Sequence, residues 1–127
     1  MSFFINQDLQ DALLNQVKNN CNKMAVLSAY SVGDSYATAN ANILSEVTMA
    51  SGDFTLGSSG NVRTLTTATK TQTAANASGT AAVVAFLDTV NSKVLWVTDE
   101  TNSAVITSGL QVVYPSTVLR VLQTANG

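Results

Sequence analysis

Two neighbouring carboxylates, Asp99 and Glu100 in VTDETN, are the clearest candidates for acid–base or metal chemistry in the sequence. A glycosidase holds two acids ~5–9 Å apart across a cleft, a geometry that neighbours on one loop rarely reach. A calcium loop needs denser oxygen ligands than DETN supplies. We therefore expect both carboxylates to be solvated loop residues.

The possible nucleophiles lack a base. The chain contains no histidine, which removes the commonest general base and the commonest metal ligand. Ser92 and Lys93 are adjacent, so their side chains diverge. Asp88 in FLDTV lacks the glycine that an aspartic protease needs two residues later. Cys21 is the only cysteine, which excludes an intrachain disulfide, and we expect it to fill space late in a helix. The sequence predicts no enzyme, no metal site and no cofactor.

The composition restricts the possible partners. Of the 127 residues 46% are hydrophobic and only 11% are charged, and the six Lys and Arg residues are scattered singly. Nucleic acid is not an expected partner, because no basic stripe is present to neutralise phosphates. No run approaches the ~20 apolar residues of a membrane span. MSFFINQDLQ does not resemble a secretory signal, so we expect the chain to be made and folded in the cytoplasm.

One segment has helical periodicity, residues 6–22. Asn6 is a plausible N-cap, and apolar residues recur at three- and four-residue spacing. The pattern predicts a short amphipathic helix whose buried stripe consists of Leu9, Leu13 and Val17, with Ala12 beside them. A segment of 1–22 would thus comprise an N-terminal arm and this helix.

From Met24 onward the period changes to two, with turn signals between short apolar runs. Residues 31–44 are polar and are expected to form a loose connection. Four threonines in RTLTTATKTQTA, at alternate positions from Thr67 to Thr73, are expected to form a solvated face of one strand. Residues 81–87 are apolar on both faces and predict a central strand that is buried on both sides. The fold class expected is mainly β. Residues 1–127 should form a single domain, in which one short N-terminal helix precedes an antiparallel β-sandwich or barrel-like part over 23–127.

The order of these segments is similar to that of a known group of proteins. A short helix leads into KMAVLSAY, followed by GDSYATA, VTMASGDFTL, LTT, ASGTAAVVAFLDT, KVLWVTDET and ITSG. Over nearly the whole chain, this pattern resembles small virion proteins of tailed bacteriophages that decorate or cement the capsid. The resemblance implies a β-rich protein on the capsid surface of the virion. It also implies that the protein bridges subunits of the major capsid protein, usually as a homo-oligomer such as a dimer or trimer.

The contact to the capsid or to another subunit is expected in the N-terminal segment Phe3, Phe4 and Ile5. Three consecutive apolar residues ahead of a helix cap cannot all face that helix's own stripe, so at least one should contact a neighbour. The alternative function is a virion surface module that binds a host glycan or receptor. Such a module should expose Trp96 or Tyr36 beside polar loops, whereas a cement protein should bury Trp96.

Overall fold

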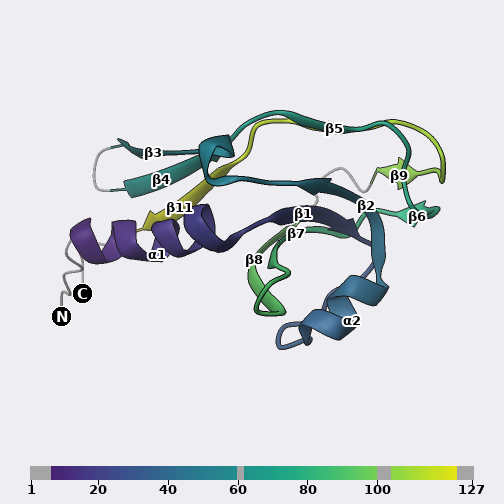
Figure 1. Cartoon of the computed structure of the whole chain (residues 1–127), viewed down its shortest axis with the longest axis horizontal. Helices are drawn as coiled ribbons and strands as arrows, with labels where there is room; N and C mark the ends of the chain where they lie inside the picture. Colours follow the sequence, from purple (N-terminus) through teal and green to yellow (C-terminus); the bar gives the residue numbers. More distant parts are fainter. Residues whose placement is uncertain (1–6, 60–61, 100–103, 123–127) are drawn as a thin grey trace.

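Short antiparallel strands make up most of the fold, with one main helix near the N-terminus (Figure 1). The computed structural model describes residues 7–59, 62–99 and 104–122. The prediction of a mainly β, antiparallel, sandwich-like architecture is confirmed.

A four-stranded antiparallel sheet forms the centre of the fold. Its order is β2 (Ile43–Thr48), β1 (Lys23–Leu27), β7 (Val83–Asp88) and β8 (Lys93–Asp99). Residues of β7 alternate between the two faces: Ala85 and Leu87 pack on one side and Phe86 on the other, and all three are fully buried. The prediction of a central strand buried on both faces is therefore confirmed for residues 83–87, whereas Ala81 and Ala82 precede the strand and Ala82 is exposed.

Three smaller sheets surround the central one. The first consists of β11 (Val118–Leu122), β4 (Val62–Thr67) and β3 (Phe54–Ser59), and a 3-10 turn (Ser51–Asp53) precedes it. The other two are pairs: β10 (Val112–Tyr114) with β5 (Lys70–Gln72), and β6 (Gly79–Thr80) with β9 (Val105–Ile106). The β5–β10 pair lies over one face of the central sheet, which gives the sandwich its second layer (Figure 1).

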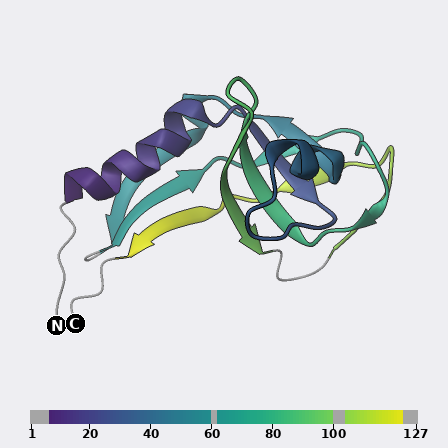
Figure 2. The same cartoon turned by 90° about the horizontal axis from the view of Figure 1, so that it is seen from below.

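Helix α1 (Gln7–Asn20) lies along the three-stranded sheet (Figure 2). The helix occupies almost the predicted segment, but the predicted stripe is wrong. Leu14 and Val17 are buried, whereas Leu9 and Leu13 are 57% and 51% exposed, and Gln10 is fully buried.

Two charged side chains determine which face of α1 is turned toward the sheet. Asp11 accepts hydrogen bonds from Nε and a terminal nitrogen of Arg63 on β4, at 2.7 and 3.0 Å. About two turns further on, Lys18 donates to the carbonyls of Ser51 and Phe54 at 2.8 and 2.9 Å. Both side chains must reach the sheet, and the face that carries them turns Leu9 and Leu13 outward.

A second helix, α2 (Tyr36–Ala41), was not expected in the polar segment 31–44. Ser35 caps it by accepting a hydrogen bond from the Thr38 amide at 3.2 Å. The helix places Ala39 against the face of the central sheet opposite to β5–β10, in a small core cluster. That burial, and not an apolar repeat, stabilises α2.

The expected threonine face is confirmed only in part: Thr69, Thr71 and Thr73 are exposed, but the single strand is wrong, because β4 ends at Thr67 and β5 begins at Lys70 in a different sheet. Thr67 is only 2% exposed. Its hydroxyl oxygen accepts from the Thr117 amide at 2.9 Å, and its carbonyl accepts from the Ser116 hydroxyl at 2.6 Å. These hydrogen bonds to the segment before β11 interrupt the predicted strand at Thr67.

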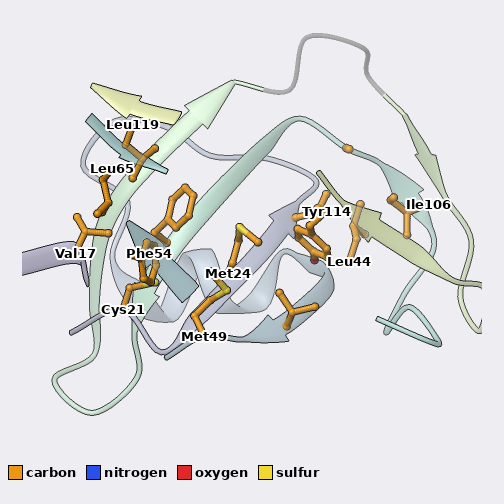
Figure 3. Packing of buried hydrophobic residues seen from close by; sticks show 14 of the residues in the cluster. Val17, Cys21, Met24, Leu44, Met49, Phe54, Leu65, Ile106, Tyr114 and Leu119 are labelled. Atoms are coloured by element: carbon orange, nitrogen blue, oxygen red, sulfur yellow. The ribbon is translucent and has the colours of Figure 1, made fainter. Parts of the chain in front are cut away.

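The larger core cluster runs along the molecule from Val17 of α1 to Ile106 of β9 (Figure 3). Near its centre the rings of Phe54 and Phe86 pack at a 54° tilt, with centroids 6.4 Å apart. One continuous cluster thus joins α1, the three-stranded sheet and the β5–β10 pair to the central sheet.

Candidate interaction surfaces

Of the residues considered above for catalysis, Asp88 has a structural role. Asp88 ends β7, and its carboxylate accepts from the amides of Val90 and Asn91 and from the Asn91 side chain. The Asn91 side chain and amide hold the pKa of this carboxyl below its ordinary value. Asp88 therefore closes the turn between β7 and β8. Glu100 lies outside the described residues, as does the side-chain environment of Asp99.

Cys21 is a poor nucleophile at neutral pH. Its thiol is 3% exposed, and burial raises its pKa to about 11. Among residues 7–59, 62–99 and 104–122, no three His, Cys, Asp or Glu side chains gather as metal ligands do. Within the same ranges, no helix is long and apolar enough to cross a membrane.

The N-terminal segment Phe3, Phe4 and Ile5 lies outside the described residues. Its contact with a capsid protein or another subunit stays a prediction. The structure does describe where α1 begins, and two large apolar side chains are exposed on the helix that follows this segment. We call the exposed pair Leu9 and Leu13 the α1 outer row.

The α1 outer row is the first of two exposed apolar surfaces. An i, i+4 pair lies on one side of a helix, so the two leucines form one continuous strip. Sequence analysis assigned both residues to the core, because Leu9–Leu13–Val17 and Gln10–Leu14–Val17–Cys21 are overlapping rows with helical spacing. In the structure the second row faces the core, and even its polar member, Gln10, is fully buried.

The second apolar surface lies at β9 and β10. Val105, Leu110 and Val113 are 76%, 61% and 57% exposed. Beside them is a cavity of about 130 Å³, which we call the β10 groove. It is lined by Met24, Val26, Ala81, Val84, Ala104, Ile106, Val112, Val113, Tyr114, Pro115 and Thr117. None of these side chains is charged. A signal was present in the sequence, which has no charged residue between 104 and 118.

Hydrogen bonds hold β5 and β10 over the central sheet and thereby shape the groove. Tyr114 of β10 donates its hydroxyl to Ser45 of β2 at 2.7 Å, and Ser45 donates to the Gln72 side-chain carbonyl of β5 at 2.6 Å. The same Gln72 oxygen accepts from the Glu46 amide at 2.9 Å. Burial raises the pKa of Tyr114 to about 12, so the phenol stays protonated and donates throughout the neutral range.

A second depression, which is polar, lies at the C-terminal end of α1. Its volume is about 350 Å³, and asparagines from α1, from the segment after it and from the β7–β8 turn contribute to its lining. Several of these amides are already engaged: Asn22 accepts from the Thr89 amide, and Asn20 donates to Gln16. No aromatic side chain lines this depression, so it lacks a stacking platform for a sugar.

Comparison of the chain with protein-family models, with curated proteins and with solved structures finds no match.

Proposed function

We propose that this chain is a structural virion protein without catalytic activity. It binds the outer surface of a phage capsid and stabilises the shell by bridging subunits of the major capsid protein. The observation that carries the proposal is the α1 outer row, Leu9 and Leu13, at 57% and 51% exposure. Adjacent exposed leucines supply apolar area that a protein partner can bury.

The modest free energy of each expected contact is sufficient for binding to a repeating capsid lattice. Burying the remaining half of a leucine side chain is worth about 1 kcal/mol, so the α1 outer row contributes about 2 kcal/mol per copy. A bridging subunit makes several such contacts at once, and multivalency converts modest single contacts into firm attachment. Because charged residues make up only 11% of the chain, attachment should depend weakly on salt.

Phe3, Phe4 and Ile5 extend this apolar character beyond the start of α1, and we include them in the contact to the capsid or to a neighbouring subunit. The partners are the major capsid protein and further copies of the chain.

The alternative, a module that binds a host glycan or receptor, is less well supported. Trp96 is partly buried and packs against the larger core cluster, and Tyr36 is partly buried against the smaller one. A stacking platform needs a freely exposed aromatic face.

The test compares two double variants of the full chain on undecorated shells of the phage that encodes it. Leu9→Gln with Leu13→Gln keeps good helix formers on α1 and removes the apolar strip. Val32→Gln with Val90→Gln is the matched control, because these valines are 101% and 81% exposed elsewhere on the molecule.

The α1 variant should bind shells about thirtyfold more weakly, which corresponds to about 2 kcal/mol. The control should bind as the unchanged chain does. Equal binding by all three proteins would remove the α1 outer row from the contact. Circular dichroism and urea unfolding establish that both variants remain folded.

A further inference from the structure

The β10 groove has the size and chemistry of a site for one aromatic ring. Its volume is about 130 Å³, and none of its lining side chains is charged. An apolar protein cavity of roughly 150 Å³ holds a benzene molecule. Met24 and Val84 form the side toward the central sheet, and Ile106, Val112 and Tyr114 form the opposite side. Met24, Tyr114 and Ile106 follow one another along the cluster in Figure 3.

The groove is accessible from the surface of the molecule. Val113 on its rim is 57% exposed, and Ala104 and Pro115 are also exposed. Strand β10 pairs with β5 alone among the described strands, so its second edge is open to main-chain pairing there. An extended segment can therefore lie along β10 and direct one side chain into the groove.

We propose that the occupant is the N-terminal segment of a second copy of this chain, with the ring of Phe3 or Phe4 in the β10 groove. Residues 1–6 precede the described part of the chain and contain no charged side chain. Adjacent residues of an extended segment point to opposite sides. One phenyl ring enters the groove while the other covers the exposed Val113 beside it.

A chain's own phenylalanines cannot reach its own groove. Phe3 is four residues before Gln7, so their Cα atoms are at most about 14 Å apart. Helix α1 has 14 residues and is itself about 21 Å long. Met24 and Val26 of β1 line the groove, and β1 continues away from the far end of α1 (Figure 1). Only another molecule can supply the ring.

The resulting contact is head-to-tail, because the α1 end of one copy meets the β10 end of the next. Contacts of this kind close into a ring or continue along a lattice. The contact needs no capsid protein, so it can be tested without shells. Its failure would leave the role proposed for Leu9 and Leu13 intact.

The experiment mixes variants of the full chain, each with one added cysteine, under mild oxidation. One protein carries Phe4→Cys and the other Val113→Cys; the native Cys21 is buried and does not compete. The matched control replaces the second protein with Val90→Cys, an exposed valine on the β7–β8 turn. We expect a disulfide-linked heterodimer from the first mixture and little from the control.

Analytical ultracentrifugation of reduced proteins supplies the second readout. Phe3→Ser with Phe4→Ser should raise the dissociation constant of self-association at least about tenfold. Ala104→Phe, which fills the groove from its exposed rim, should do the same, and Val90→Ser should not. A monomeric unchanged chain, or equal cross-linking with both cysteine partners, would overturn the proposal. Protection of Val113→Cys only on shells would overturn it too, because the occupant would then be a capsid segment.

Discussion

The hydroxyl chain from Tyr114 through Ser45 to Gln72 should behave as one energetic unit. Tyr114→Phe removes the hydrogen bond from the phenol to Ser45, while Ser45 keeps its bond to Gln72. Because one neutral bond contributes about 1 kcal/mol net, the free energy of unfolding should fall by about that amount.

Ser45→Ala should cost more than Tyr114→Phe. Residue Tyr114 is only 4% exposed, and the substitution removes the acceptor of its phenolic proton. A buried donor that loses its partner costs about 1–3 kcal/mol. Gln72 still accepts from the Glu46 amide, so the damage stays local.

The double variant should lose less stability than the sum of the two single variants, because the second substitution removes a group that the first has already left unpaired. We expect a coupling energy of about 1 kcal/mol from a double-mutant cycle measured by urea unfolding. The matched cycle pairs Tyr114→Phe with Ser31→Ala, whose side chain is exposed in the loop before α2. That cycle should be additive. Additivity within about 0.3 kcal/mol in the first cycle would refute the hydrogen-bonded link between β10 and β2.

Three further predictions concern other buried groups. Phe86→Ala should lower the free energy of unfolding by about 3–5 kcal/mol, since the ring is fully buried against Phe54; a loss below about 1 kcal/mol in urea unfolding would contradict its central position. Gln10→Leu should raise stability by about 1–3 kcal/mol, because neither amide atom of this fully buried side chain has a hydrogen-bond partner in the structure; a loss on thermal or urea unfolding would show that the amide is paired. The pKa of Cys21 is raised from 9.0 to about 11 and that of Tyr114 from 10.0 to about 12, so folding favours both protonated forms. Their contribution to stability is complete below about pH 9 and should be lost as the pH rises to about 12; a free energy of unfolding that stays flat over this range would contradict both burial effects.

The sequence could predict those strands whose hydrophobic pattern depends only on which side chains are buried. Residues 83–87 are apolar on both faces, and the central strand β7 buries side chains of this run on both sides of the sheet. The extent of α1 was also predictable, within two residues at each end, from its apolar spacing and its acidic first turn.

The orientation of α1 was not predictable, because it depends on Arg63 and on the carbonyls near Ser51, which are distant in sequence. Helix α2 has no apolar repeat and exists because Ala39 is buried against the sheet. The division at Thr67 depends on the Thr117 amide fifty residues later. In each case a tertiary contact overrides the local period.

The interaction surfaces were predictable only in part. The apolar segment Phe3–Ile5 and the uncharged stretch 104–118 are visible in the sequence. The β10 groove is not visible in the sequence, because its lining combines β1, β7, β9 and β10, which meet only in the folded chain.

The most direct test of the capsid-binding proposal is co-sedimentation of the unmodified chain with undecorated phage shells. We predict saturable binding at a fixed ratio to the capsid protein, a higher melting temperature of the shells, and little change between about 0.1 M and about 1 M salt. A chain that stays in the supernatant at saturating concentration would contradict the capsid-binding function. So would a chain that sediments without a fixed ratio and leaves the melting temperature of the shells unchanged.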